Sequence, residues 1–204
     1  MTAIIDYGVG NLFSLVSSLK KIGEDAVVTA EKSVLRSADR IILPGVGAFC
    51  DAAEKLAKSG LVPVLTEQIA KGVPVMGICL GMQLLFDKSY EFGEHSGLGL
   101  IKGEIVPIKD AVPNDFKIPH IGWNSLNFKG EKSKIFKYIK NGDYVYFVHS
   151  YYAAKCDLNI TATTDYGAEL TASAENGNVY GCQFHPEKSG TVGLKILKAF
   201  CELE

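Results

Sequence analysis

Apolar positions in the first half of the chain alternate between a strand-like and a helix-like spacing. Residues 3–6 form a short apolar run that predicts a β-strand. After a glycine-containing turn, apolar residues recur at spacings of three and four, which predicts a helix with one buried stripe. The stripe consists of Leu12, Leu15, Val16, Leu19 and Ile22. The chain therefore begins as a strand-turn-helix unit.

The same alternation continues to residue 78. Strands are predicted over residues 26–29 and 40–43, and helices over 51–58 and 64–71, the second helix ending at Gly72. Residues 73–78 form a continuous apolar run of strand length, which is typical of a central strand covered on both faces. This order predicts a mostly parallel sheet with helices on both faces.

The second half is richer in β-strand signals. Apolar and β-branched runs occupy residues 99–107, 144–148, 160–164, 168–174 and 179–184. Asn176-Gly177 lies between the last two and indicates a hairpin, and a closing helix is predicted over residues 192–203. We expect an antiparallel or mixed β-rich extension of the sheet. No linker, repeat or low-complexity segment divides the chain, so residues 1–204 are predicted to form a single α/β domain.

Composition narrows the possible partners. The 204 residues include 21 Lys plus Arg and 23 Asp plus Glu, which gives a formal net charge of −2 at pH 7. This balance argues against nucleic-acid binding, which would rest on a basic face. The most apolar segment, residues 73–86, is shorter than the roughly 20 residues of a membrane helix, so no membrane span is expected. Small anionic substrates and protein partners remain compatible with this composition.

The cysteines and glycines also limit the cofactors. Five cysteines without a CxxC pair argue against a disulfide framework or a zinc site, and the four histidines show no ligand spacing, so no metal is expected. Gly8-Val9-Gly10 would need a glycine at position 13 to match a dinucleotide fingerprint, but Phe13 stands there. We expect no cofactor. The first residues show no secretory signal, which predicts a reducing, cytoplasmic environment.

Chemistry is indicated first by Gly77-Ile78-Cys79-Leu80-Gly81, which follows the central strand and precedes a helix predicted to start over residues 82–86. This is the nucleophile-elbow pattern with cysteine in the serine position. A helix N-terminus would favour the thiolate of Cys79, and the Leu80 N–H would point to a developing oxyanion. A structural cysteine in a tight turn is the alternative, because free cysteines are often simply buried.

A general base is indicated near the end of the chain. Among the four histidines only His185 ends an apolar strand and has a carboxylate, Glu187, two residues later. Glu187 could orient His185 and stabilise its charge, and Pro186 would restrict the turn between them. Alone, the His-x-Glu pattern could also be a pair of neighbouring side chains on the protein surface. Together with the elbow it favours catalysis by Cys79, His185 and Glu187.

These motifs carry a family resemblance. The chain resembles the class I (triad) glutamine amidotransferases, and in particular those members that serve as glutaminase subunits of imidazole glycerol phosphate synthase in histidine biosynthesis. The resemblance spans nearly the whole chain, through residues 6–12, 43–49, 77–83, 119–124, 149–151 and 183–188. It implies a flavodoxin-like fold and the hydrolysis of L-glutamine to glutamate and ammonia.

The resemblance also implies residue roles. Cys79 would attack the side-chain amide of glutamine, while His185 would move the protons and Glu187 would hold the imidazole. The oxyanion hole would be built from Leu80 and the loop that contains Val46 and Gly47, and a flip of that loop could gate activity. The residues that would bind the rest of glutamine are Gln83, Glu91, Ser150 and Tyr151. For Gln83 a helix-surface amide, and for Glu91 an exposed loop charge, are the alternatives.

A partner follows from the resemblance as well. The family's partner here is a (β/α)8-barrel cyclase, which forms a heterodimer with the glutaminase and receives ammonia through a tunnel to form imidazole glycerol phosphate and an aminoimidazole carboxamide ribotide. The matching positions on the partner-facing side are Asn11, Trp123, Tyr146 and Lys188. Each has a structural alternative: a helix cap, a core aromatic, a strand residue and a solvated charge.

Two other functions stay open. A paralogous amidotransferase subunit could supply ammonia for the amination of a surface sugar, since its triad would look the same. A non-catalytic binding subunit could keep the fold without the chemistry, but the intact set of Cys79, His185 and Glu187 argues against it.

Overall fold

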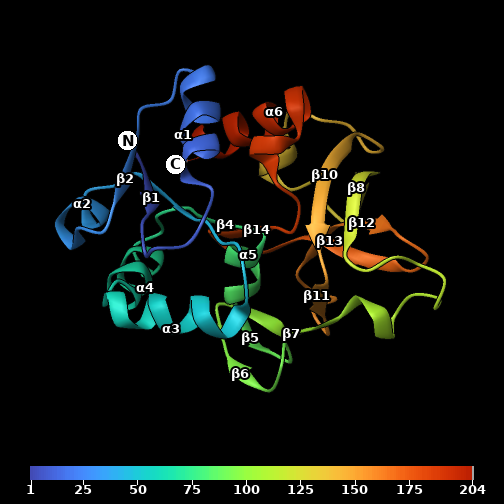
Figure 1. The fold of residues 1–204 in the computed structure, drawn as a ribbon. Helices are drawn as coiled ribbons and strands as arrows, with labels where there is room; N and C mark the ends of the chain where they lie inside the picture. Colours follow the sequence, from blue (N-terminus) through green and yellow to red (C-terminus); the bar gives the residue numbers. More distant parts are fainter. Residues whose placement is uncertain (204) are drawn as a thin grey trace.

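The structure, a computed structural model, describes residues 1–203 and contains one large sheet (Figure 1). Its eight strands lie in the order β2-β1-β3-β4-β14-β13-β12-β9. The parallel strands are β1 (Thr2–Ile5), β2 (Ala26–Thr29), β3 (Arg40–Leu43), β4 (Val75–Ile78) and β14 (Val179–Cys182). The antiparallel strands are β13 (Glu169–Asn176), β12 (Ile160–Asp165) and β9 (Asn127–Phe128). The predicted parallel core with an antiparallel extension is confirmed.

Helices cover both faces of the parallel strands, as predicted (Figure 1). One face carries α1 (Leu12–Lys21) and α6 (Gly190–Cys201), and the other carries α2 (Lys32–Arg36), α3 (Phe49–Ser59) and α4 (Val62–Ala70). Alternate residues of β1 face the two sides, because Ile4 packs in one apolar cluster with Leu15 and Phe200, whereas Ile5 packs in the other with Leu56. In β4, Val75 and Met76 divide in the same way, so this strand is central and covered on both faces.

Two predictions for the middle of the chain need correction. The helix expected to begin over residues 82–86 is α5 (Leu80–Leu84), and Phe86 already belongs to strand β5 (Phe86–Ser89). The helix ends because the carbonyls of Leu84 and Leu85 accept hydrogen bonds from the N–H groups of Leu98 and Leu100 instead of from a following helical turn. The sequence pattern could not show this long-range pairing.

The β-rich runs also do not all extend the main sheet. A separate four-stranded sheet combines β5 with β6 (His95–Ser96), β7 (Ile101–Pro107) and β11 (Tyr151–Ala154). Strand β10 (Tyr144–His149) instead pairs antiparallel with β8 (His120–Ser125), and residue 149 lies opposite residue 120. The 3-10 helices are η1 (Ile108–Asp110), η2 (Lys134–Phe136) and η3 (Pro186–Lys188).

The hairpin expected at Asn176-Gly177 is confirmed. Asn176 in β13 pairs with Val179 in β14, and Gly177 in the two-residue turn has φ +60°. The hairpin delivers β14 beside β4, with which it runs parallel, so the segment after β14 emerges at the same edge of the sheet as the segment after β4.

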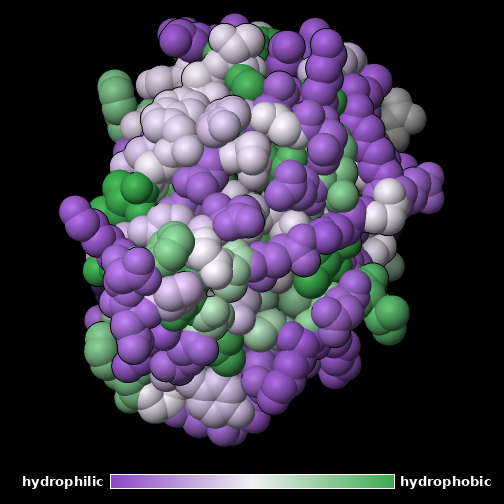
Figure 2. All heavy atoms as spheres, turned by 90° about the vertical axis from the view of Figure 1, so that its right-hand side faces the viewer, coloured by the Kyte–Doolittle hydropathy of each residue, from purple (hydrophilic) through white to green (hydrophobic). Residues whose placement is uncertain are grey.

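The outer surface is mostly polar on the face over β8 and β12. Figure 2 shows this face, where polar residues predominate and apolar ones form small separated patches. Within residues 1–203, no helix is long and apolar enough to cross a membrane. All five cysteines are free thiols; Cys50 is exposed, whereas Cys79, Cys156, Cys182 and Cys201 are buried.

Candidate active site

The turn after β4 places Cys79 at the carboxyl edge of the parallel strands, where α/β sheets bind ligands. Cys79 has φ +54° and ψ −111°, a backbone conformation that L-residues rarely adopt, and its N–H donates to the Cys182 carbonyl at 2.7 Å. A Cβ on Gly77 would lie 2.6 Å from the Gly81 carbonyl oxygen, and one on Gly81 would lie 1.9 Å from that of Leu43. The two glycines therefore make this sharp turn possible.

The segment after β14 brings His185 to the same edge. His185 Nδ1 and Glu187 Oε1 are 2.8 Å apart, and the two side chains are 3% and 4% exposed. Burial alone lowers the pKa of His185, but contacts with the Cys79 thiol and the Glu187 carboxylate outweigh it and raise the pKa to about 9. The structure thus brings together the three side chains of the predicted triad.

The backbone around His185 is held by Ser189. The Ser189 hydroxyl donates to the His185 carbonyl at 2.6 Å and accepts the Tyr146 N–H at 2.9 Å. The His185 N–H in turn donates to the Tyr146 carbonyl at 2.9 Å. These bonds fasten the turn before η3 to strand β10, so the imidazole is held on a rigid support.

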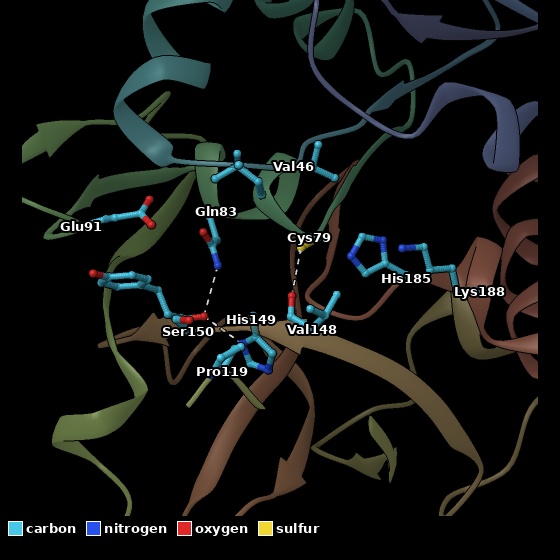
Figure 3. A pocket seen from close by; sticks show the side chains of 13 residues that line it. Val46, Cys79, Gln83, Glu91, Pro119, Val148, His149, Ser150, His185 and Lys188 are labelled. Atoms are coloured by element: carbon cyan, nitrogen blue, oxygen red, sulfur yellow. Dashed lines mark hydrogen bonds between the residues drawn. The ribbon is translucent and has the colours of Figure 1, made fainter. Parts of the chain in front are cut away.

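A pocket of about 310 Å³ opens in front of Cys79 (Figure 3). This volume is at the lower end of the range of about 300–1,000 Å³ that is usual for small-molecule sites. The lining residues are Val46, Gly47, Cys79, Leu80, Gln83, Glu91, Pro119, Val148, His149, Ser150, Tyr151, His185 and Lys188. They include every predicted oxyanion-hole and substrate residue, and all of the predicted triad except Glu187, which lies behind His185.

Gln83 lies in the wall of this pocket and is not a helix-surface amide. Its Nε2 donates to the Tyr151 carbonyl at 3.1 Å and to Gln183 Oε1 at 3.0 Å. Both amide hydrogens are thereby used, so only its oxygen stays available to a ligand. Gln183 Nε2 reaches the Cys79 sulfur at 3.8 Å, which connects the nucleophile to the far wall.

Glu91 is not a freely exposed loop charge. It follows strand β5, and its Oε2 accepts the N–H of Phe49 at the start of α3. Figure 3 shows Glu91 and Gln83 on one side of the pocket and Cys79 and His185 on the other. The pocket therefore has an acidic end and a nucleophilic end.

Three of the four predicted interface residues lie close together near the pocket mouth. Lys188 Nζ lies 6.0 Å from the centre of the Tyr146 ring, and that ring lies 5.9 Å from the ring of Trp123. Trp123 is 52% exposed, so it is not a core aromatic. Asn11 caps α1 by accepting the Ser14 N–H at 3.4 Å and borders a small recess that His185 and Val46 also line.

Three motif residues at the pocket have no role predicted from the sequence: Pro119 and His149 line it, as does Val148 outside the motifs, and Gln183 bonds Gln83 and the Cys79 sulfur. Gln183 and Pro119 stand within the motifs at residues 183–188 and 119–124, and His149 begins the motif at 149–151. Their positions in motifs were the available signal, but their contacts depend on how distant strands pair. Within residues 1–203, no group of three or more His, Cys, Asp or Glu side chains could hold a metal ion.

Comparison with known proteins identifies the family. The sequence model of the family "Glutamine amidotransferase class-I" matches residues 3–202. The chain belongs to the class I glutamine amidotransferase family. Family membership agrees with the elbow cysteine and with the His-Pro-Glu segment as found in the structure.

Similar members of the family carry a more specific description. A protein of Caldanaerobacter subterraneus subsp. tengcongensis described as "Imidazole glycerol phosphate synthase subunit HisH" is 50% identical over 204 residues, covering 100% of this chain and 98% of that protein. One of Aquifex aeolicus with the same description is 51% identical, covering 98% and 95%. This glutamine amidotransferase is thus similar to them over nearly its full length.

Solved structures of lower identity share the fold. A chain of the PurLQS structure from Thermotoga maritima has a TM-score of 0.75 at 21% identity, covering 98% of this chain and 96% of that chain. The glutaminase domain of CTPS from Trypanosoma brucei, solved with acivicin, has a TM-score of 0.68 at 17% identity, with coverages of 100% and 94%. The flavodoxin-like amidotransferase fold is therefore confirmed.

Proposed function

We propose that this family member is the glutaminase subunit of imidazole glycerol phosphate synthase, which hydrolyses L-glutamine and delivers the ammonia to a cyclase subunit in histidine biosynthesis. The observation that carries the hydrolysis is Cys79 on its strained turn, facing a buried His185 that pairs with Glu187 at 2.8 Å. The pathway is supported by relatives at about half identity that are described as HisH subunits.

In the proposed reaction, His185 holds the proton given up by Cys79 as an imidazolium beside Glu187, and the sulfur attacks the side-chain amide carbon of glutamine as a thiolate. The oxyanion is stabilised by the N–H of Leu80 and by a backbone donor of the loop containing Val46 and Gly47. One such donor contributes about 10²–10³ in rate. His185 then gives its proton to the departing nitrogen, so ammonia leaves and a thioester forms. Water activated by His185 cleaves the thioester and releases glutamate.

Pocket chemistry supports glutamine as the substrate. Gln83 offers an acceptor oxygen, and Glu91 places a carboxylate at the end away from Cys79. Both suit the α-ammonium group of an amino acid, while Ser150 and Tyr151 line the same wall. The distance across the pocket would separate the ammonium from the amide that Cys79 attacks.

The partner surface is proposed to lie around Lys188, Tyr146 and Trp123, with Asn11 beside the recess near His185. This cluster borders the pocket mouth and exposes aromatic surface, as protein interfaces often do. Val46 is 44% exposed at the same mouth, so a partner bound there would contact the oxyanion loop and could set its conformation. A (β/α)8-barrel cyclase is the partner that the HisH relatives suggest.

The test is glutamate release from glutamine by the purified chain, alone, with its barrel partner, and with the partner and the imidazole-pathway ribonucleotide. We expect strong stimulation by the last combination. Hydrolysis that needs the partner but ignores the nucleotide would favour a sugar-modifying paralogue, and absence of hydrolysis under all conditions would favour a binding subunit. The Cys79→Ala variant is expected to abolish turnover, and retained turnover would exclude Cys79 as the nucleophile.

A further inference from the structure

A continuous chain of hydrogen bonds connects the glutamine pocket to the outer strand β8. It runs from the Tyr151 carbonyl to His149 Nδ1 (2.8 Å), from His149 Nε2 to His120 Nδ1 (2.9 Å), and from His120 Nε2 to Asn124 Oδ1 (2.9 Å). Asn124 Nδ2 then donates to the Asp165 carbonyl at 2.9 Å. Both imidazoles are buried, at 0% exposure for His120 and 6% for His149.

Both ends of this chain are carbonyl oxygens, which only accept hydrogen bonds. With the Asn124 amide oriented toward Asp165, its oxygen faces His120. The three bonds made by the two imidazoles then need three ring protons, while two neutral imidazoles carry two. If the Asn124 amide is turned around, its nitrogen donates to His120. Its oxygen then faces the Asp165 carbonyl, so two acceptors meet there instead. In the neutral state one bond of the chain is therefore always missing.

With the Asn124 oxygen facing His120, the missing bond has three positions: at Asn124, at the Tyr151 carbonyl, or between the two rings, where two unprotonated nitrogens would face each other 2.9 Å apart. In the first arrangement His149 Nδ1–H holds the Tyr151 carbonyl and the mismatch lies at Asn124. In the second, His120 Nε2–H holds Asn124, and an unprotonated His149 Nδ1 faces the Tyr151 carbonyl, where two acceptors repel each other. As long as the bond between the two rings is kept, the two ends of the chain therefore compete for the same protons.

The surroundings keep the pair in its neutral state. Burial lowers the pKa of His120, and it lowers the pKa of His149 to about 3, with further contributions from the charges of His120 and His185. The ring of Tyr166, a further titratable side chain, stacks on His120 with centroids 4.0 Å apart. Asp165 contributes only its carbonyl, because its carboxylate accepts the Gly167 N–H.

The Tyr151 carbonyl matters because it lies between this chain and the reaction site. It also accepts the Gln83 amide at 3.1 Å, and Gln83 is bonded to Gln183, which reaches the Cys79 sulfur. At the other end, Ile121 and Trp123 on β8 are 56% and 52% exposed. A contact on this strand is thus two or three hydrogen bonds away from the wall of the pocket.

We propose that His120 and His149 are positioning residues for the glutamine site, because the arrangement of their shared protons decides whether the Tyr151 carbonyl is held or released, in competition with Asn124. The proposal rests on the proposed glutaminase function for its kinetic consequence. Its structural part, the competition between two tautomers, stands on the hydrogen-bond chain alone.

The first test reads the tautomers directly, by nitrogen-15 NMR of the histidine rings in the full chain at neutral pH. The four histidines are assigned by single substitutions, including His95→Phe, which lies outside the chain of bonds. We expect His149 to exchange between two neutral tautomers in the wild type. In Asn124→Leu, which removes the competing acceptor, His149 should be fixed with its proton on Nδ1. An unchanged single tautomer in both proteins would overturn the proposal.

The second test measures glutamine hydrolysis in the complex with the partner. Asn124→Leu should lower the KM for glutamine by about 2- to 10-fold, the range that one hydrogen bond supplies. His149→Phe should raise KM by a similar factor, with kcat within about 2-fold in both variants because neither residue belongs to the triad. Ser125→Ala, next to Asn124 on β8, is the matched control and should change neither constant.

A second variant guards against misfolding of Asn124→Leu. His120→Phe keeps the ring stacked on Tyr166 but removes both nitrogens, and it should shift the His149 tautomer and the KM in the same direction as Asn124→Leu. Changes in kcat and KM without a tautomer shift would show a merely structural role and contradict the proposal. Failure of the proposed function would look different, since the wild-type complex itself would then release no glutamate while the tautomer exchange persisted.

Discussion

His185 and His149 are both buried at the pocket, yet their environments act in opposite directions. His185 faces the Glu187 carboxylate and the Cys79 thiol, which raise its pKa to about 9 despite its burial. His149 lies between a carbonyl and a second imidazole, and burial lowers its pKa to about 3. Burial alone therefore does not decide the charge of a histidine; the neighbouring group does.

The contrast separates two tasks within one pocket. A histidine that moves protons needs an anionic partner so that its protonated form is stable during the reaction. A histidine that holds the backbone in a fixed place is better neutral, since it then donates with one nitrogen and accepts with the other. Histidine thus transfers protons on one wall of the pocket, at His185, and positions the backbone on the other, at His149.

The largest difference between the two histidines is expected in turnover. His185→Gln should lower kcat by at least about 10⁴-fold, because the proton carrier is lost, whereas His149→Gln should cost about 10-fold or less. Glutamate release at saturating glutamine, in the complex, measures both. Equal losses in the two variants would contradict the division of tasks.

A smaller loss is expected when His185 keeps its ring but loses its anion. Glu187→Gln should lower kcat by about 10³- to 10⁴-fold, as an amide in this place no longer stabilises the charged imidazole. Its pKa should fall as well, which a titration followed by NMR would detect. Glu54→Gln, on the exposed part of α3, is the control and should behave as the wild type. An unshifted His185 pKa in Glu187→Gln would refute the role of the carboxylate.

The free energy of unfolding should depend on pH through both histidines, but in opposite pH ranges. The folded pKa of His185 lies above the unfolded value of about 6.5, so its contribution is complete below pH 6.5 and is lost as pH rises toward 9. At about 1.4 kcal/mol per pKa unit, the contribution is about 3 kcal/mol. The folded pKa of His149 is lowered, so its contribution is present above pH 6.5 and is lost as pH falls toward 3.

Urea unfolding across this pH range measures both windows. His185→Gln should flatten the loss of stability on the alkaline side, and His149→Gln should flatten it on the acidic side. If either variant flattened the wrong side, the sign of the corresponding pKa shift would be wrong.

The smallest effect on turnover is expected when the hydrogen bonds that hold the backbone of His185 are removed. Ser189→Ala removes the hydroxyl that bonds the His185 carbonyl and the Tyr146 N–H, which should cost about 1–3 kcal/mol of unfolding free energy with a modest fall in kcat. Ser59→Ala is the control, since its hydroxyl also donates to a carbonyl at 2.6 Å but lies at the end of α3, away from the pocket. A kcat loss as large as that of Glu187→Gln would show that Ser189 takes part in the chemistry.

Much of the cysteine side of the pocket could be predicted from the sequence, because local rules determine it. The Gly77–Gly81 segment predicts a sharp turn after an apolar strand. This turn is possible because glycine has no Cβ, and a Cβ would not fit at either position. The parallel strands before it could be predicted for the same reason, as each is a short apolar run followed by an amphipathic helix. The pairing of His185 with Glu187 could be predicted as well, because they are two residues apart in the sequence.

The opposite wall could not be predicted in the same way. Glu91 reaches the pocket only because β5 pairs with β7, and β5 begins where the pattern favoured a longer helix. The pairing of His149 with His120 depends on the register of β10 against β8, which no local pattern fixes. Side chains brought together by long-range register are therefore the part that required a structure.

The distribution of thiols described above makes the pocket open to selective covalent labelling. Cys156, Cys182 and Cys201 are buried, and burial raises the pKa of each, to about 12 for Cys201, so they react slowly with electrophiles. Cys50 is exposed on α3, while Cys79 lines a cavity. Replacing Cys50 by serine would leave one thiol within reach from solution, so that a fluorescent or spin label would report on the pocket alone.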